Sequence, residues 1–466
     1  MSTPDAPWRG RRLHFIGVGG AGLSGYARAA SALGAQVSGS DSSRSPYLER
    51  LAADGVLQAH VGHAEGNVPP GEDVEVIYSS AVPEQNVERL AARRRGLPER
   101  PRAELLGELT ALRRTIAVAG THGKTTTAAM LVHALRGAGA DPGWLIGGTP
   151  DAQLPNAAWR PGEWLVVEAD ESDRSMLELH VEIAVLTNVE HDHHATFASI
   201  AELREAFRGF LAAAQRAIVL REEPVLLQLV PQDTSSLTVA AFAPPPFTLT
   251  PGGSSFRWRS AQVSLVVAGA HNVLNAIAAL EAASLAGADE ELAARALGSF
   301  GGAGRRFELL GLSERGALIY DDYAHHPTEV AATLAAARTF GCKRLVCAFQ
   351  PHLYSRTALL AREFGRALAG ADVIVVLDVY PARERADEHP GVSGLLIAEA
   401  AADAAAGKPV YWLPGFQQAE EVLHELLGPR DICVLMGAGD IDELARALAV
   451  ADVENAAAAG VGAKRR

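Results

Sequence analysis

The stretch TIAVAGTHGKTTT, residues 115–127, decides the fold of this chain. It opens with five apolar or β-branched residues that predict a buried strand, and a helical run follows over residues 126–136. The loop between them is rich in Gly and Thr and ends in Gly-Lys-Thr. In such a strand–loop–helix unit, backbone N–H groups at the helix N-terminus can surround a phosphate. The stretch therefore predicts an α/β domain with a site for a nucleoside triphosphate.

The side chains of this loop have the chemistry that a triphosphate needs. Lys124 can reach the outer phosphates, and the Thr125 hydroxyl can bind Mg²⁺. Val118 stands where the standard G-x-x-x-x-G-K-[ST] pattern has its first glycine, so a loop without a nucleotide remains the alternative. The nucleotide-binding candidates are Gly120, Thr121, His122, Gly123, Lys124, Thr125 and Thr126.

A second glycine cluster, GVGGAG at residues 17–22, lies near the N-terminus. It follows a short apolar run and precedes a helix-length segment, as a diphosphate-binding G-x-G-x-x-G turn does. Asp41 ends the next predicted strand, where a carboxylate could accept a hydrogen bond from a ribose hydroxyl. On its own, the motif favours a dinucleotide, with a turn that binds no ligand as the alternative. Two phosphate sites in one chain, however, disfavour a simple dehydrogenase.

Acidic and histidine-rich segments follow two later predicted strands. EADESD, residues 168–173, and EHDHH, residues 190–194, each come directly after an apolar run. Carboxylates at the carboxyl edge of a parallel sheet can hold Mg²⁺. EHDHH could also indicate zinc, but neighbouring side chains of an extended segment point to opposite faces and cannot all converge. We therefore favour one imidazole and one carboxylate beside the phosphates, with a surface cluster that binds no ligand as the alternative.

Strands and helix-length segments alternate in three separate regions, at residues 13–79, 115–187 and 317–436. This alternation is typical of doubly wound parallel sheets. Four stretches interrupt it: a basic connection with a solvated charge at residues 93–102, a loop-rich excursion at 242–255, a candidate hinge at 301–306 and a disordered end at 456–466.

Length and composition restrict the class of protein. The chain has 466 residues, which suggests roughly three domains, and its apolar fraction of 48% excludes disorder along the whole chain. We find no apolar run long enough for a membrane helix and no signal-peptide core. The net charge of −13 disfavours nucleic acid as a partner, and the three cysteines show no metal or disulfide spacing. We expect a cytoplasmic, multidomain protein with no membrane partner.

Taken together, the motifs resemble the Mur ligase family. They lie in family order from residue 14 to residue 440 and cover nearly all of the chain. They read HFIGVGGAGLSG, VSGSD, YSSAVP, AVAGTHGKTTT, EADESD, TNVEHDH, GAHNVLNA, RRFE, DDYAHHPTE, FQPHLYSRT and MGAGD.

The resemblance implies an α/β protein of three domains. These are a Rossmann-like UDP-sugar-binding domain at residues 1–110, a P-loop-type ATPase domain at 111–304 and a Rossmann-like amino-acid-binding domain at 305–450, followed by a disordered tail at 451–466. It also implies an ATP- and Mg²⁺-dependent ligase that joins L-alanine to the carboxylate of UDP-N-acetylmuramate through an acyl phosphate. The alternative is a related ligase that adds a preformed peptide to the same sugar nucleotide. We expect a monomer or a weak homodimer.

The resemblance also assigns roles to particular residues of this sequence. The first domain would bind the sugar nucleotide through its glycine loop, the second would bind ATP and Mg²⁺, and the third would face the reaction centre. The implied substrate-binding residues are Gly17, Gly19, Gly20, Gly22, Asp41, Ser79 and Ser80. Asn272, Asn275 and Arg306 would join the ATP loop, and the metal ligands would be Thr125, Glu168 (or Glu171) and His193. The implied catalytic residues are Lys124, Arg306, Asp322, His325, His352 and Arg356.

One departure from the family pattern concerns the amino-acid site. The family often reads PHRYSR, whereas this chain has Leu353 in place of the first arginine. Arg356 is therefore the better candidate for holding the amino-acid carboxylate. Asp322 and His325 are both open as the base that receives the amine proton.

Overall fold

The computed structural model of the protein describes residues 6–150 and 154–450. It divides into two compact units, one made of residues up to Pro244 together with 275–297, the other of 245–274 and the chain from Gly298 onward. Among the described residues, no helix is both long enough and apolar enough to cross a membrane. The predicted disordered tail from residue 451 lies outside the described residues.

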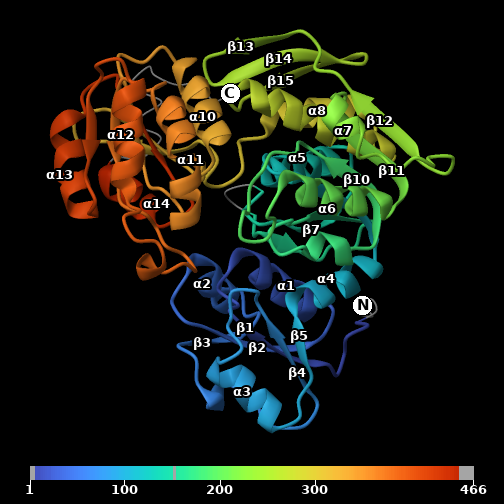
Figure 1. The fold of residues 1–466 in the computed structure, drawn as a ribbon. Helices are drawn as coiled ribbons and strands as arrows, with labels where there is room; N and C mark the ends of the chain where they lie inside the picture. The colour runs from blue at the N-terminus through green and yellow to red at the C-terminus, as the bar shows by residue number, and fades with distance from the viewer. Residues whose placement is uncertain (1–5, 151–153, 451–466) are drawn as a thin grey trace. The chain divides into compact units, whose positions relative to one another are not determined.

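The first unit begins with a parallel five-stranded sheet in the order β3-β2-β1-β4-β5. The strand order reverses at β1, so a crevice for a ligand forms at the carboxyl ends of β1 and β4. Helices α1, α2 and α4 cover one face of this sheet and α3 covers the other (Figure 1). The bounds are β1 (Arg12–Ile16), α1 (Ala21–Ala32), β2 (Gln36–Asp41), α2 (Pro46–Ala53), β3 (Gln58–Val61), η1 (Glu65–Asn67), β4 (Val74–Tyr78), α3 (Val87–Arg94), β5 (Glu99–Pro101) and α4 (Arg102–Ala111).

The central sheet of the same unit has the order β12-β11-β10-β6-β9-β7-β8 and is parallel except for β8. β6 lies in the middle, between β9 and β10. The glycine loop after β6, EADESD after β9 and TNVEHDH after β10 therefore reach the same edge of the sheet. The bounds are β6 (Arg114–Ala119), α5 (Lys124–Gly137), β7 (Gly143–Leu145), β8 (Ala157–Ala158), β9 (Trp164–Glu168), η2 (Ser175–Glu178), β10 (Val181–Leu186), α6 (Ile200–Ala212), β11 (Ala214–Arg221), α7 (Pro224–Leu227), β12 (Thr238–Phe242) and α9 (Glu290–Ala296).

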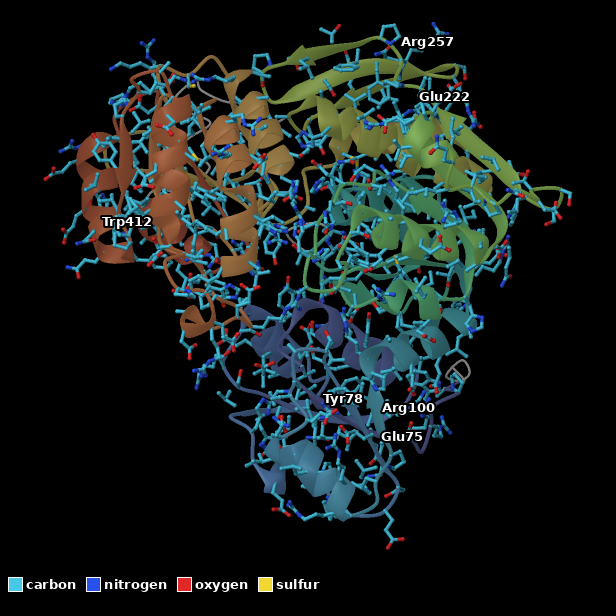
Figure 2. All side chains as sticks on the ribbon, in the orientation of Figure 1. Glu75, Tyr78, Arg100, Glu222, Arg257 and Trp412 are labelled. Carbon is cyan, nitrogen blue, oxygen red and sulfur yellow. The ribbon has the colours of Figure 1, made fainter. Side chains whose placement is uncertain are left out.

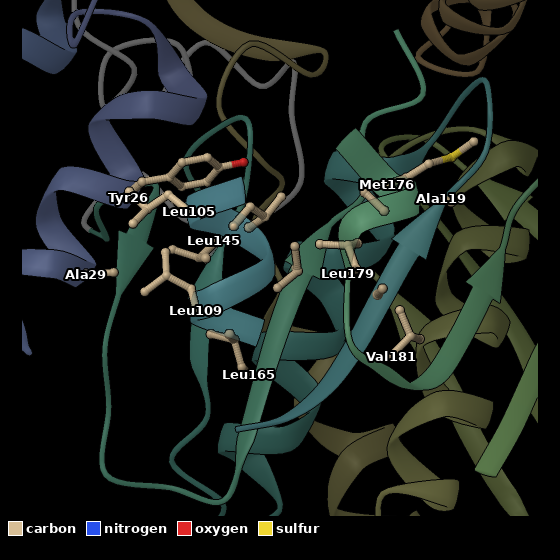
Figure 3. Close-up of a cluster of buried hydrophobic side chains, with 14 of the residues drawn as sticks. Tyr26, Ala29, Leu105, Leu109, Ala119, Leu145, Leu165, Met176, Leu179 and Val181 are labelled. Atoms are coloured by element: carbon tan, nitrogen blue, oxygen red, sulfur yellow. The ribbon is translucent and has the colours of Figure 1, made fainter. Parts of the chain in front are cut away.

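One continuous apolar core joins the two sheets of the first unit. Tyr26 on α1 and Leu105 and Leu109 on α4 belong to the same buried cluster as Leu145 and Leu165 of the central sheet (Figure 3). Interiors of this kind are close-packed and deform little. The two glycine loops are therefore held in a single packed body.

The second unit contains an antiparallel three-stranded sheet, β13-β14-β15, and a six-stranded sheet, β16-β17-β21-β18-β19-β20, in which only β16 is antiparallel. Helix α8 (Ala270–Leu285) begins in this unit and ends in the first. The bounds are β13 (Phe247–Thr250), β14 (Gly253–Trp258), β15 (Ala261–Leu265), η3 (Leu297–Ser299), β16 (Glu308–Leu312), β17 (Leu318–Asp322), α10 (Pro327–Arg338), β18 (Leu345–Phe349), α11 (Tyr354–Leu368), β19 (Val373–Val376), η4 (Ala386–Glu388), α12 (Gly394–Ala404), β20 (Val410–Trp412), α13 (Phe416–Leu426), β21 (Ile432–Met436) and α14 (Ile441–Leu448).

Of two sequence predictions about connecting segments, one is wrong and one holds only in part. Residues 242–255 are not a loop-rich excursion, because the turn at Gly252, with φ of 74°, joins β13 to β14 in a hairpin. Residues 93–102 are an exposed connection only in part, because Arg93, Arg94 and Arg95 are exposed as predicted, whereas β5 and the start of α4 follow them. Arg100 Nη1 lies 3.1 Å from Glu75 Oε2 (Figure 2), and Arg102 is only 14% exposed. Partners distant in the sequence neutralise these charges.

A buried polar network lies between the N-terminal sheet and α3. Its centre is Glu88, which is 0% exposed and accepts four hydrogen bonds. Oε2 accepts from His14 Nε2 at 3.0 Å and Ser40 Oγ at 2.6 Å, while Oε1 accepts from Asn67 Nδ2 at 2.7 Å and Ala64 N at 3.1 Å. Burial alone would raise the pKa of Glu88, but the hydrogen bonds from His14, Ser40 and Asn67 outweigh it and lower the pKa to about 2.

This network predicts acid-sensitive stability. A carboxylate whose folded pKa is depressed stabilises the fold above its unfolded pKa and loses that contribution as the pH falls. For Glu88, roughly 2–3 kcal/mol of unfolding free energy should disappear between about pH 5 and pH 2. The free energies of unfolding of wild type and Glu88→Gln, measured with urea across that range, should converge as the pH falls. Glu65→Gln is the control, because this exposed carboxylate lies on η1, which also contributes Asn67 to the network. Its stability should show the same pH dependence as that of wild type. A constant difference between wild type and Glu88→Gln would contradict the prediction.

Candidate functional site

The loop between β6 and α5 has a backbone that only glycine fits. Gly120 has φ of 130°, and a Cβ there would lie 2.1 Å from Thr187 Oγ1. Gly123 has φ of 79°, and a Cβ there would lie 2.6 Å from Asn275 Oδ1. Asn275, an ATP-binding candidate from the sequence, therefore lies directly against the loop.

The segment after β10 braces this loop from the neighbouring strand. Thr187 Oγ1 and Asn188 Nδ2 both donate to the carbonyl oxygen of His122, at 2.7 and 2.9 Å. Asn188 Oδ1 accepts from the His122 N–H at 2.9 Å, and Thr121 Oγ1 donates to the Glu190 carbonyl at 2.9 Å. These bonds hold the loop open as a cradle, with the N-terminus of α5 facing it.

Lys124 shares a buried carboxylate with His193. Its Nζ donates to Glu171 Oε1 at 2.9 Å and to the carbonyls of Gly120 and Thr121, and His193 Nε2 lies 3.3 Å from the same Oε1. Burial alone would lower the pKa of Lys124, but the carboxylates of Glu171, Asp170 and Glu168 outweigh it and raise the pKa. Lys124 therefore keeps its positive charge in this buried position.

The acidic ligands proposed for a metal lie beside this pair. Thr125 Oγ1 donates to Glu168, at 2.9 and 3.1 Å from its two oxygens, and the Gly147 N–H donates to Glu168 Oε2 at 2.7 Å. Glu171 is fully buried, and its Oε2 has no hydrogen-bond partner among the described residues. A hydroxyl, two carboxylates and the His193 imidazole make an oxygen-rich donor set, which suits Mg²⁺. The unpartnered buried oxygen of Glu171 is the kind of ligand that such an ion satisfies.

The side chains of the histidine-rich segment do not converge, as predicted, but the reason is not simple alternation, because the backbone at His193 has φ of 53°. His193 turns toward Glu171, whereas the rings of His191 and His194 contact each other at an angle of 57°, with centroids 4.3 Å apart. Asp192 is buried and accepts from the N–H of His193. Only His193 of these four residues faces the Lys124–Glu171 pair.

Neighbouring side chains contact the N-terminal glycine cluster closely and fix the conformation of its backbone. Gly17 has φ of 83°, and Ser79 Cβ lies 3.2 Å from where a Cβ would stand. The Gly19 N–H donates to Asp41 Oδ2 at 2.8 Å, and Ser45 Oγ donates to the Gly19 carbonyl. Asp41 therefore organises the loop, a role that the sequence did not indicate. Gly20, Gly22 and Ser80 lie at the same edge.

A cavity of about 200 Å³ lies between this loop and the carboxylates of Glu168 and Asp170. Among its walls are Gly22, Tyr26, Arg102, Glu168 and Asp170. Arg102 Nη2 and Nε reach the central domain, donating to Asp170 at 2.9 Å and to Asp173 at 2.7 Å, and burial raises the pKa of Tyr26 to about 12. Sequence analysis missed both residues. The sequence could have indicated Arg102, because it begins a helical segment and an acidic stretch, EADESD, follows a later predicted strand.

The candidates in the second unit gather at the carboxyl edge of the six-stranded sheet. His325 and His352 have ring centroids 6.0 Å apart, and Arg356 Nη1 donates to His352 Nδ1 at 3.2 Å. Arg356 is 3% exposed. Tyr380, which sequence analysis missed, stacks on His352 with an interplanar angle of 13°. Together these side chains form a partly aromatic cluster that contains the buried guanidinium of Arg356.

Asp322 and His325 differ in the groups that they engage. Asp322 Oδ1 and Oδ2 accept from the N–H groups of Ala324 and Phe307, each at 2.7 Å, and burial raises the pKa of Asp322 to about 6. His325 Nδ1 lies 2.9 Å from the carbonyl oxygen of Tyr323. A carbonyl can only accept, so Nδ1 carries a proton and the neutral ring keeps its lone pair on Nε2.

The remaining candidates lie near these groups in the second unit. Arg306 lies over the Tyr323 ring at 5.2 Å and 4.0 Å from Glu329. Asn272 is buried and donates to the Ala268 carbonyl at 2.7 Å. Leu353 is 8% exposed, with φ of 70°, so it contributes packing and no charge at the start of α11.

Comparison with known proteins gives consistent matches along the chain. Residues 12–114 match the Mur ligase family catalytic domain, residues 118–283 the Mur ligase middle domain and residues 305–439 the Mur ligase glutamate ligase domain. A UDP-N-acetylmuramate–L-alanine ligase of Rubrobacter xylanophilus is 44% identical over 92% of this chain and 97% of its own length. That of Chlorobium chlorochromatii is 38% identical over 94% of this chain and 97% of its own.

Solved structures give the same picture. The UDP-N-acetylmuramate–alanine ligase of Thermotoga maritima has a TM-score of 0.79 and 27% identity, covering 96% of this chain and 99% of that one. A murein peptide ligase of Psychrobacter arcticus has a TM-score of 0.70 and 22% identity, covering 98% and 100%. The second likeness, at this identity, concerns the fold alone.

The crowding at Gly120 yields a test of the loop. Gly120→Ala should weaken ATP binding at least about tenfold, because the new methyl group would displace Thr187 and with it the bracing of the loop. Gly139→Ala is the matched control: its φ of 86° is also left-handed, but nothing lies within 4 Å of its Cβ position. The control should lose about 1 kcal/mol of stability and keep ATP affinity. Titration with a fluorescent ATP analogue measures the affinity of each variant, and equal affinity in the two variants would contradict the assignment.

Proposed function

This chain belongs to the Mur ligase family, and we propose that it is the ATP-dependent ligase that joins L-alanine to the carboxylate of UDP-N-acetylmuramate in peptidoglycan precursor synthesis. The observation that carries the proposal is the similarity, along nearly the whole chain, to curated ligases of that name. The likeness to a murein peptide ligase concerns the fold, so addition of a preformed peptide has less support.

The reaction must overcome two chemical obstacles. A carboxylate is a poor electrophile, and it is repelled by the triphosphate that would activate it. In the proposed reaction, the carboxylate oxygen attacks the γ-phosphorus, ADP leaves, and an acyl phosphate forms. The amine then attacks the acyl carbon, phosphate leaves, and an amide is made. The protein must therefore place positive charge around the phosphates and accept the proton that the amine loses.

The phosphate site supplies the positive charge. Lys124 lies at the mouth of a glycine loop whose amides face the same space, and we assign it to the outer phosphates. Arg306 is assigned to the γ-phosphate, and Asn272 and Asn275 to the adenine nucleotide. Thr125, Glu168 and His193 would hold Mg²⁺, and the unpartnered oxygen makes Glu171 a further ligand. When bound, Mg²⁺ would neutralise phosphate charge.

In the amino-acid site, we assign His325 as the base that accepts the proton of the amine. The hydrogen bond from its Nδ1 to Tyr323 leaves the basic lone pair on Nε2, whereas the Asp322 oxygens already accept backbone N–H groups. Buried Arg356 is assigned to the alanine carboxylate, since Leu353 has no charge to offer. His352 orients Arg356 through their hydrogen bond.

In the sugar-nucleotide site, Gly17, Gly19, Gly20 and Gly22 bind the diphosphate, while Asp41, Ser79 and Ser80 complete the site. We also propose that the enzyme works in the cytoplasm as a monomer or weak homodimer.

The phosphate assignment can be tested by removing the lysine. Lys124→Ala should abolish phosphate release in the presence of ATP, UDP-N-acetylmuramate and L-alanine, because no other side chain replaces its charge in the loop. Binding of UDP-N-acetylmuramate, measured by calorimetry, should stay within about twofold of wild type. The wild-type assay with L-alanine, glycine, L-serine and a tripeptide establishes the amino-acid substrate. Turnover by Lys124→Ala, or a wild type active only with the tripeptide, would contradict the proposal.

Gly19→Val is the reciprocal variant. A Cβ at Gly19 would lie 2.9 Å from both Asp41 Oδ2 and Ser45 Oγ, so a larger side chain should distort the N-terminal loop. Affinity for UDP-N-acetylmuramate should fall at least about tenfold while ATP still binds normally. Unchanged affinity for the sugar nucleotide would remove this loop from the site.

A further inference from the structure

His63 lies at the edge of the N-terminal sheet where a nucleotide would bind, directly after β3. The Gly62 N–H before it donates to the Asp41 carbonyl at 2.7 Å, which ties His63 to the end of β2. The His63 side chain is 20% exposed. Neither the motifs nor the assigned site residues include it.

The position of the cavity indicates which part of a sugar nucleotide reaches this edge. The diphosphate belongs at the glycine loop, and the acid that reacts must extend toward the carboxylates of the central sheet. The cavity leads that way, since it runs from Gly22 to Glu168 and Asp170. Arg102, on the same wall, follows β5 at the opposite side of the sheet from β3. The nucleoside must therefore extend in the other direction, over the ends of β2 and β3, to Asp41 and His63.

Hydrogen bonds behind His63 fix which of its nitrogens carries the proton. An ionised carboxylate only accepts, so the 2.6 Å contact between Ser40 Oγ and Glu88 uses the serine proton. Ser40 Oγ must then accept from its other partner, His63 Nδ1, at 3.0 Å. The same Nδ1 lies 3.5 Å from Glu88 Oε1, which also favours a proton there. In the neutral ring, the lone pair is consequently on Nε2.

We propose that His63 reads the base of the sugar nucleotide, with Nε2 accepting a hydrogen bond from the N3–H of uracil. The proposal rests on the function proposed above and names a determinant of its nucleotide specificity. No described residue makes a hydrogen bond with Nε2. Cytosine has a lone pair at N3 instead of a proton, so it would face the lone pair of His63. The buried chain from Glu88 through Ser40 thereby makes the site select uracil.

Substitutions of His63 separate this role from a structural one. In His63→Asn, the amide nitrogen can occupy the place of Nδ1 and keep the bond to Ser40, but no acceptor remains at the place of Nε2. His14→Gln is the matched control, since His14 binds the same Glu88 carboxylate and is fully buried, away from any nucleotide. The probes are UDP, CDP and the diphosphate of N3-methyluridine, measured by calorimetry on the full chain.

We expect wild type to bind UDP about 10- to 100-fold more tightly than CDP or the N3-methyl analogue. His63→Asn should bind UDP about three- to tenfold more weakly, and its preference over CDP should fall below about threefold, with an unchanged Tm. His14→Gln should lower the Tm and keep the preference. In wild type labelled with ¹⁵N-histidine, NMR should show the His63 proton on Nδ1.

The outcomes distinguish the two proposals. A wild type that binds no UDP would overturn the proposed function and this inference with it. A wild type that binds UDP without preference over CDP, or a His63→Asn variant with an undiminished preference, would overturn the inference alone. A proton found on Nε2 would overturn it as well.

Discussion

The buried ion pair of Lys124 with Glu171 is the interaction on which the rest of the site depends. A lysine that is 13% exposed lies 2.9 Å from a carboxylate that is 0% exposed, with His193 beside them, so each offsets the cost of burying the other. If Lys124 turns to a phosphate, Glu171 loses a partner in a place that water does not reach. A divalent cation restores that balance, because it prefers carboxylate oxygens. In the proposed function, the pair would thus link nucleotide binding to metal binding.

Small residues on α1 allow the two glycine loops to lie in one packed body. A Cβ on Gly25 would lie 3.0 Å from Ala157 Cβ, and Asn156 Nδ2 donates to the Ala21 carbonyl at 2.6 Å. Larger side chains there would push the N-terminal sheet away from the central one. Arg102 adds two ion pairs across the same contact. Ligation needs a carboxyl oxygen in line with a phosphorus, and rigid packing between the two loops serves that alignment.

The sequence predicted those parts of the fold and site whose geometry is local. Lys124 and Thr125 follow their glycines directly, so the loop alone indicates their position, and strands such as β18 and β19 are continuous apolar runs. Arg102 was not predictable in the same way, because its partners Asp170 and Asp173 lie about 70 residues away and the basic stretch looked solvated. The hairpin of β13 and β14 was missed because it is stabilised by pairing across a glycine turn and not by its own composition. In both cases, contacts between segments determine the structure, and composition alone does not reveal those contacts.

Backbone strain occurs at several of the same positions, although other residues with positive φ, such as Arg259 and Ala406, lie elsewhere. His193, Arg305, Phe307 and Leu353 all have φ between 51° and 70°, a region that side chains other than glycine avoid. Each is at or next to an assigned residue: His193 is a proposed metal ligand, Arg305 and Phe307 flank Arg306, and Leu353 follows His352. Arg305 is held in this conformation by Asp321 at 3.0 Å and the Gly437 carbonyl at 3.1 Å. Strain of this kind persists only where surrounding contacts over-determine the backbone, so the strained neighbours of Arg306 and His352 argue that these two side chains are held in fixed directions.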